Sequence, residues 1–132
     1  MIVDTSAVIE LLRGTQSATH LRLRRALQRA EPVRIPAVVL QEVLQGARSP
    51  AHFLKLQAEM EMLPVFEPAD VTELHRQAAM LYARCRWHGL TPRSPMDCVI
   101  AACALEAEVP LLANDRDFSG MAQIEPRLKL LP

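Results

Sequence analysis

Short apolar segments alternate with longer amphipathic segments along this 132-residue chain, and this alternation is the feature that most constrains its fold. The short segments predict strands at residues 1–3, 32–36, 63–66, 110–113 and 127–131. The longer segments carry apolar residues at helical spacing and predict helices over residues 7–13, 17–30, 37–47, 51–62, 69–88 and 94–108. Short apolar strands separated by helices are typical of a parallel sheet that is covered on both faces. We therefore predict an α/β fold with a single domain over residues 1–132, a three-layer sandwich with a central, mostly parallel sheet between helices.

Composition narrows the class of protein. Half of the residues are apolar and only 4% are aromatic, so aliphatic side chains must form the core. The 15 basic and 15 acidic residues balance, which argues against a disordered tail protein and against generic basic binding to nucleic acid. The three cysteines form no C-x-x-C pair, which argues against a disulfide framework and against a zinc site.

No targeting segment is visible, and the longest uncharged apolar run, residues 98–105, is too short to cross a bilayer. We expect a reduced, cytoplasmic protein without a membrane span.

Acidic residues stand at the edges of several predicted elements. Asp4 ends the first predicted strand, and Asp115 and Asp117 follow the strand predicted at residues 110–113. Asp97 opens a helix that is apolar enough to be buried. The carboxyl ends of parallel strands meet at one edge of a sheet, which is where the active sites of such folds lie. The sequence therefore indicates carboxylates that face one cleft.

Each acid also has a plain structural explanation. Asp4 can cap the helix that follows it. Asp97 ends the segment Ser94-Pro95-Met96-Asp97, which has a capping-box pattern. The acids that follow the fourth strand lie in a sequence typical of turns. Glu42 lies opposite the apolar stripe of its predicted helix, which is typical of an exposed residue. Taken one at a time, none of these acids identifies a site.

Taken together, the acids indicate a metal site. Clustered carboxylates without histidine or cysteine partners are hard oxygen ligands, which suit Mg²⁺ or Mn²⁺ better than zinc. Crowded acids repel one another unless a cation neutralises them. A divalent ion held by such acids activates water and stabilises the charge on a phosphodiester.

Four segments carry a resemblance to a known family. They are Ile2-Val3-Asp4-Thr5-Ser6, Gln41-Glu42-Val43-Leu44-Gln45-Gly46, Ser94-Pro95-Met96-Asp97-Cys98-Val99-Ile100-Ala101-Ala102 and Leu111-Leu112-Ala113-Asn114-Asp115-Arg116-Asp117-Phe118. In this order and spacing, the chain resembles the PIN-domain ribonucleases, and most closely the VapC-type toxins of toxin–antitoxin pairs. The match spans essentially the whole chain, and the ordered set is more specific than any one segment. The resemblance implies a PIN-like sandwich and metal-dependent endonucleolytic cleavage of RNA.

The resemblance also implies a set of site residues. It carries the family's four catalytic acids onto Asp4, Glu42, Asp97 and Asp115. Asp4 and Asp97 would be direct ligands of Mg²⁺ or Mn²⁺, and the other two would bind a second metal or hold waters of the metal. Asp117 is a further candidate ligand, because related sequences vary over which acid of this turn they use.

Supporting groups and partners follow from the same resemblance. Thr5 or Ser6 would offer a hydroxyl near the acids, whereas Ala113 stands where many relatives carry a hydroxyl. The expected partners are RNA, a second copy of the chain in a homodimer, and a cognate antitoxin protein whose tail would occlude the acidic groove.

Arginine supplies 13 of the 15 basic residues, and its guanidinium can hold a phosphate through two hydrogen bonds. Arg84, Arg86 and Arg93 lie in a stretch without acids and are candidates for binding the RNA backbone. Solvated helix faces are the alternative explanation for this stretch. Trp87 could stack on an unpaired base or pack at a dimer interface, and we favour packing.

Three other functions compete with this interpretation. A non-catalytic RNA-binding module of the same fold has no need for carboxylates that repel phosphate. A phosphoacceptor signalling domain would need a second acid beside Asp4 and a lysine in a late loop, whereas Lys129 lies on the last predicted strand. A PIN nuclease of RNA processing differs from a toxin in role rather than in these motifs, so the sequence leaves that alternative open.

Overall fold

The computed structural model describes residues 1–131, and its centre is a sheet of five short parallel strands. The strands are β1 (Ile2–Val3), β2 (Ile35–Pro36), β3 (Val65–Phe66), β4 (Leu111–Leu112) and β5 (Leu130–Leu131). Strand β4 pairs with β1 and β5, and β2 pairs with β3. A parallel bridge between Ile2 and Arg34 joins the two groups, which gives the order β3-β2-β1-β4-β5. The prediction of a parallel sheet is confirmed, although each strand is shorter than the apolar segment that predicted it.

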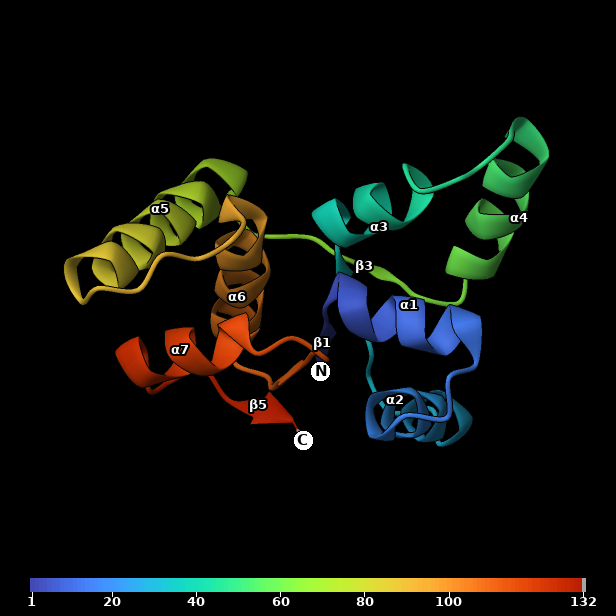
Figure 1. The fold of residues 1–132 in the computed structure, drawn as a ribbon, viewed down its shortest axis with the longest axis horizontal. Helices are drawn as coiled ribbons and strands as arrows, with labels where there is room; N and C mark the ends of the chain where they lie inside the picture. The colour runs from blue at the N-terminus through green and yellow to red at the C-terminus, as the bar shows by residue number, and fades with distance from the viewer. Residues whose placement is uncertain (132) are drawn as a thin grey trace.

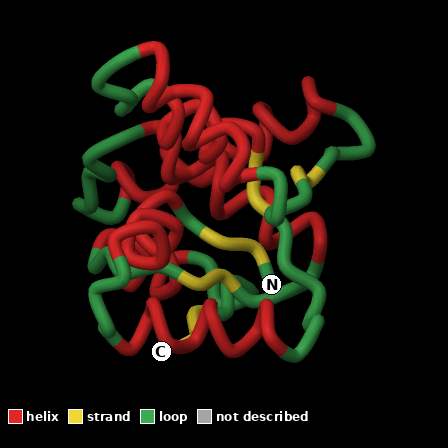
Figure 2. Tube along the Cα trace, turned by 90° about the vertical axis from the view of Figure 1, so that its right-hand side faces the viewer, coloured by secondary structure: helices red, strands yellow, loops and turns green. Residues whose placement is uncertain are grey.

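Seven helices surround these strands in the described residues. They are α1 (Thr5–Arg13), α2 (Ala18–Gln28), α3 (Ala37–Leu44), α4 (Pro50–Met60), α5 (Val71–Trp87), α6 (Pro95–Ala107) and α7 (Asp117–Ile124). Six of them were predicted, with ends that differ by at most three residues. Helix α7 was not, because its first residues have a sequence typical of turns. Figure 2 shows helices on both sides of the strands, so the α/β sandwich is confirmed.

The core is aliphatic and centres on the strands and helix α6. Figure 1 shows α5, α6 and α7 together on one side of β1, with α1 to α4 on the other side. Cys98, Ile100 and Cys103 of α6 are almost completely buried, which fits the interpretation of these cysteines as small core residues. Phe118 of α7 is fully buried against the same core. Within residues 1–131, no helix is both long enough and apolar enough to span a membrane.

Candidate metal centre

Asp4 lies where the carboxyl ends of β1 and β4 meet. Its amide donates a hydrogen bond to the Leu112 carbonyl over 2.9 Å, which continues the pairing of the two strands. Its side chain is buried, and Oδ2 accepts hydrogen bonds from the Ser6 amide (3.1 Å) and the Ser6 hydroxyl (2.6 Å). Asp4 is therefore the N-cap of α1 and also points into the edge of the sheet where a site is expected. The capping explanation and the site explanation are compatible for this residue.

Two hydroxyl groups connect the acids to neighbouring elements. The Ser6 hydroxyl that donates to Asp4 also accepts from the Asn114 amide over 2.8 Å, so it joins the start of α1 to the turn after β4. The Thr5 hydroxyl donates to Glu42 Oε1 over 3.1 Å. Glu42 is therefore half-buried rather than plainly exposed. Both hydroxyl residues suggested by the sequence lie beside the acids. Ser6 is hydrogen-bonded to Asp4, and Thr5 is hydrogen-bonded to Glu42.

Three carboxylates come closest together. Asp97, in the first turn of α6, and Asp115 and Asp117, after β4, each offer an oxygen atom within 4.8 Å of the others. The Asp117 amide donates to Asp115 Oδ1 over 2.9 Å, which fixes the turn that carries both residues. Asp117 therefore belongs to the tightest group, whereas Asp4 lies outside this group and is more buried.

The capping box predicted at the start of α6 forms only in part. Ser94 is the N-cap, and its hydroxyl accepts from the Met96 amide over 3.1 Å. Within residues 1–131, no hydrogen bond joins the Asp97 carboxylate to the Ser94 amide, which would complete the box. The Asp97 carboxylate is thus directed to the other acids instead of to its own helix.

The acids act on one another electrostatically. Burial first, and then repulsion from Asp4, Asp115, Asp117 and Glu42, raises the pKa of Asp97 to about 7. Burial also raises the pKa of Asp4, although its hydrogen bonds to Ser6 oppose the shift. Burial raises the pKa of Glu42 as well, with a further contribution from Asp4. The five carboxylates therefore form one cluster that a bound cation would stabilise.

Arg93 lies directly on this cluster. Its Nε donates to Asp117 Oδ2 over 2.8 Å, and its Nη2 lies 3.2 Å from Asp115 Oδ2. Arg84 points elsewhere, because its Nη2 donates to the Ile124 carbonyl over 2.7 Å. Arg86 is exposed at the end of α5. The sequence drew attention to all three arginines but did not reveal that Arg93 pairs with the acids, because residues 93 and 117 are brought together only by the fold.

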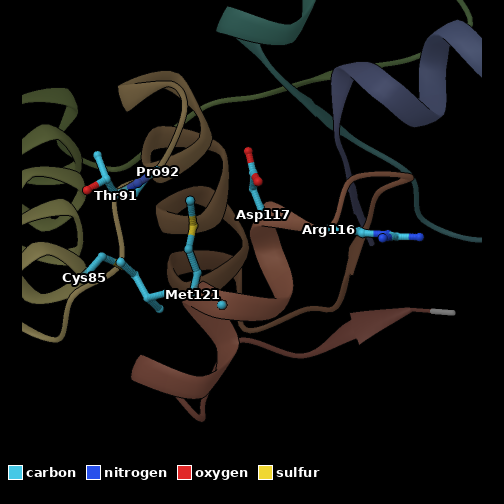
Figure 3. Close-up of a pocket in the computed structure, with 8 residues that line it drawn as sticks. Cys85, Thr91, Pro92, Arg116, Asp117 and Met121 are labelled. Atoms are coloured by element: carbon cyan, nitrogen blue, oxygen red, sulfur yellow. The ribbon is translucent and has the colours of Figure 1, made fainter.

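Three hollows border the cluster, and one of them, of about 290 Å³, lies beside Asp115. Another of about 520 Å³ opens beside Glu42 between α1, α3 and α4. Three cationic residues line it, Arg13, Arg48 and Lys55, together with Glu59, whose carboxylate lies 3.9 Å from Lys55 Nζ. A smaller one of about 170 Å³ lies beside Asp117 (Figure 3). In that view the Asp117 and Arg116 side chains point in different directions. The hollow of 520 Å³ thus places two arginines, Arg13 and Arg48, beside Glu42, which the sequence did not indicate.

The donor set fits a divalent cation of the Mg²⁺ class. The closest group consists of carboxylates alone, which are the ligands that Mg²⁺ and Mn²⁺ prefer. Oxygen atoms that share one such ion at about 2.1–2.4 Å must lie within about 5 Å of one another, and the three aspartates meet this condition. Asp97, Asp115 and Asp117 could therefore hold one ion, with Asp4 close enough to influence it.

Comparisons with known proteins agree on one family. The model of the PIN domain family matches residues 1–124. Ribonuclease VapC11 from Mycobacterium tuberculosis and VapC ribonuclease Mb1587 from Mycobacterium bovis are each 32% identical over 125 residues, which covers 94% of this chain and 92% of theirs.

Solved structures share the fold. VapBC2 from Rickettsia felis, bound to a DNA fragment from its promoter, contains a chain that superposes with a TM-score of 0.74 at 18% identity. The alignment covers 98% of this chain and 96% of that one. VapBC-5 from Mycobacterium tuberculosis gives a TM-score of 0.69 at 22% identity, covering 98% and 95%.

Proposed function

The chain belongs to the PIN domain family, and from this we propose that it is a metal-dependent endoribonuclease that acts in the cytoplasm as the toxin of a toxin–antitoxin pair. We assign the reaction to Asp4, Glu42, Asp97 and Asp115 and add Asp117 as a metal ligand. The cofactor is Mg²⁺ or Mn²⁺, and the substrate is RNA.

The observation that carries this proposal is the convergence of five carboxylates at the carboxyl edge of a parallel sheet. Burial of Asp97 and then repulsion from the other four acids raise its pKa to about 7, which is a cost that a purely structural cluster has no reason to retain. A module that only bound RNA would be weakened by the same negative charge. The cluster therefore favours a nuclease over the non-catalytic alternative.

Each residue of the cluster has a role in this proposal. Asp97, Asp115 and Asp117 would hold the ion, which would supply a Lewis acid that activates water and neutralises charge on the phosphodiester. Ser6 holds Asp4 in one orientation, and Thr5 does the same for Glu42. Such fixed groups stabilise developing charge without reorganising during the reaction.

The RNA backbone would approach along the hollow beside Glu42. Arg13 and Arg48 line that hollow and carry the positive charge that a polyanion requires, whereas Lys55 is paired with Glu59 of the same lining. Of the arginines suggested by the sequence, Arg86 remains available to the backbone on an exposed surface, whereas Arg84 is held by the end of α7.

Cleavage of RNA is the direct test. We expect purified, antitoxin-free protein to cut total RNA at discrete positions in Mg²⁺ or Mn²⁺, and EDTA to stop the reaction. Asp4→Asn should lose the cuts, because it removes a buried negative charge from the cluster. Glu67→Gln is the matched control, since it removes a negative charge from an exposed position. A folded protein that binds Mn²⁺ but cuts no RNA in a broad panel would identify a binding module.

Growth distinguishes a toxin from a nuclease of RNA processing. We expect induction of the wild-type chain in a bacterial host to arrest growth, and induction of Asp4→Asn to the same level to leave growth unchanged. A small partner protein should co-purify with the chain from its native cells. Normal growth at a level of active nuclease that cleaves RNA in the purified assay would assign the chain to RNA processing.

The homodimer belongs to the same proposal. Trp87, at the end of α5, is 70% exposed, so the side chain is available either for a second copy or for an unpaired base. An aromatic ring left in water at the end of a helix is well suited to an interface.

A further inference from the structure

We infer that Arg93 is a built-in counter-ion of the metal centre, which a metal ion must displace from Asp115 and Asp117 before it binds. The inference rests on the proposed function of these acids as metal ligands. Arg93 would thereby regulate the affinity of the site for metal, because Asp115 and Asp117 would bind either its guanidinium or a divalent ion.

The contacts of Arg93 are with the atoms that an ion would use. Nε lies 2.8 Å from Asp117 Oδ2, and Nη2 lies 3.2 Å from Asp115 Oδ2 and 3.3 Å from Asp115 Oδ1. Both aspartates belong to the closest group of carboxylates. A divalent ion on these carboxylates would be repelled by a guanidinium on the same atoms, so the two cations compete.

The pairing is asymmetric. Among residues 1–131, Asp115 and Asp117 form ion pairs with Arg93, whereas Asp97 forms none. Arg93 therefore neutralises part of the cluster and leaves the charge of Asp97 uncompensated. The guanidinium holds two of the ligands together while the third still requires a cation.

The position of Arg93 permits its displacement. Its side chain is 75% exposed and lies in the segment between α5 and α6, so it can turn into solvent without disturbing the core. Exposed ion pairs are weak. A divalent ion gains contacts with three carboxylates, which is enough to replace a monovalent group that contacts two.

Binding of Mn²⁺ without RNA tests the inference. Calorimetric titration of Mn²⁺ into metal-free protein should give Arg93→Gln an affinity roughly three to thirty times higher than the wild type, because no guanidinium has to leave. Arg93→Lys should lie between the two, since it keeps the charge and loses the double hydrogen bond. Arg116→Gln is the matched control: it removes the same charge from an exposed side chain that points away from Asp117 (Figure 3).

Thermal unfolding gives a second readout. Arg93→Gln should melt at a lower temperature than the wild type without metal, and saturating Mn²⁺ should narrow or reverse this difference. Arg93→Lys provides the same comparison with the charge retained, should the glutamine variant fold poorly.

The outcomes separate this inference from the proposed function. If the wild type binds Mn²⁺ and Arg93→Gln binds it no more tightly than Arg116→Gln does, Arg93 acts only as a distant charge and the inference is wrong. If none of these proteins binds Mn²⁺, the metal centre itself is wrong and the inference falls with it.

Discussion

The Asp97→Asn variant is expected to lose RNA cleavage by a factor of at least about one hundred, while its metal-free form becomes more stable than the wild-type protein at about pH 8. The two effects have one cause. Burial and then repulsion from each of the other four acids raise the pKa of Asp97. The charge that would attract a metal ion is therefore the charge that destabilises the fold when the ion is absent.

The loss of cleavage follows from the ligand set. Asparagine keeps one oxygen of the right shape at the start of α6 but removes the negative charge that a divalent ion requires. Within the closest group, Asp115 and Asp117 would remain, and Arg93 already pairs with both of them and offsets part of their charge. Cleavage rates at saturating Mn²⁺, together with the calorimetric affinity for Mn²⁺, measure this loss.

The gain in stability depends on pH, and its sign follows from the two protonation equilibria. The pKa of Asp97 is about 7 in the folded protein, against an ordinary value of 3.8. Between these values the folded protein retains a proton that the unfolded chain has released, so a rise in pH favours unfolding. The metal-free wild type should lose stability over this window, and Asp97→Asn should lack this part of the loss. The Asp97 side chain is partly exposed, so solvent screening reduces the effect. We expect the free energy of unfolding of Asp97→Asn to exceed that of the wild type by about 1–2 kcal/mol at pH 8, or roughly 3–8 °C in the melting temperature.

Asp70→Asn is the matched control for this prediction. Asp70 is the exposed N-cap of α5, and asparagine caps a helix as well as aspartate does. The control should cleave RNA at the wild-type rate and melt within a degree or two of the wild type. A wild-type cleavage rate in Asp97→Asn would remove Asp97 from the site, and equal melting temperatures at pH 8 would mean that the folded protein does not raise the pKa of Asp97.

Much of the candidate site could be anticipated from sequence because the acids are tied to element boundaries. Asp4 and Asp115 follow strands, and the carboxyl ends of neighbouring parallel strands lie at the same edge of the sheet. Asp97 is fixed in the same way by the N-cap at Ser94. Local sequence signals that locate the ends of strands and helices are therefore sufficient to predict that these residues lie near one another.

The arrangement around Glu42 and Arg93 depends on tertiary contacts that no local pattern encodes. The helical period places Glu42 away from the apolar stripe, yet the Thr5 hydroxyl, 37 residues earlier, makes it part of the cluster. Arg93 pairs with residues that lie 22 and 24 positions further along the chain. A sequence identifies the charged groups but does not say which of several arginines reaches a given acid.

Helix α7 was missed for a related reason. Its first residue, Asp117, follows Asn114 and Asp115 in a segment typical of turns, and Gly120 weakens it as an isolated helix. No side chain caps it at Arg116. The helix is held by burial of Phe118 and Met121, which are 0% and 1% exposed, and not by its intrinsic propensity.

Phe118→Ala should therefore destabilise the protein by about 3–5 kcal/mol, the usual cost of deleting a fully buried phenylalanine ring. A domain of this size has a total stability of roughly 5–15 kcal/mol, so the variant would lose a large part of it. Urea unfolding of the metal-free protein, followed by circular dichroism, measures the change. A cost below about 1 kcal/mol would mean that Phe118 does not anchor α7 in the core.

Phe118→Leu separates loss of packing from loss of the site. Leucine keeps an apolar side chain in the core and should cost less than about 1.5 kcal/mol, so α7 would remain folded and Asp117 would stay beside Asp115. Because Phe118 follows Asp117 directly, unfolding of α7 would release one of the three closest carboxylates. We expect Phe118→Ala to weaken Mn²⁺ binding by roughly tenfold or more even under conditions where the rest of the protein is folded, and Phe118→Leu to bind Mn²⁺ almost as the wild type does. Equal Mn²⁺ affinities in the two variants would mean that the turn after β4 holds its acids without α7.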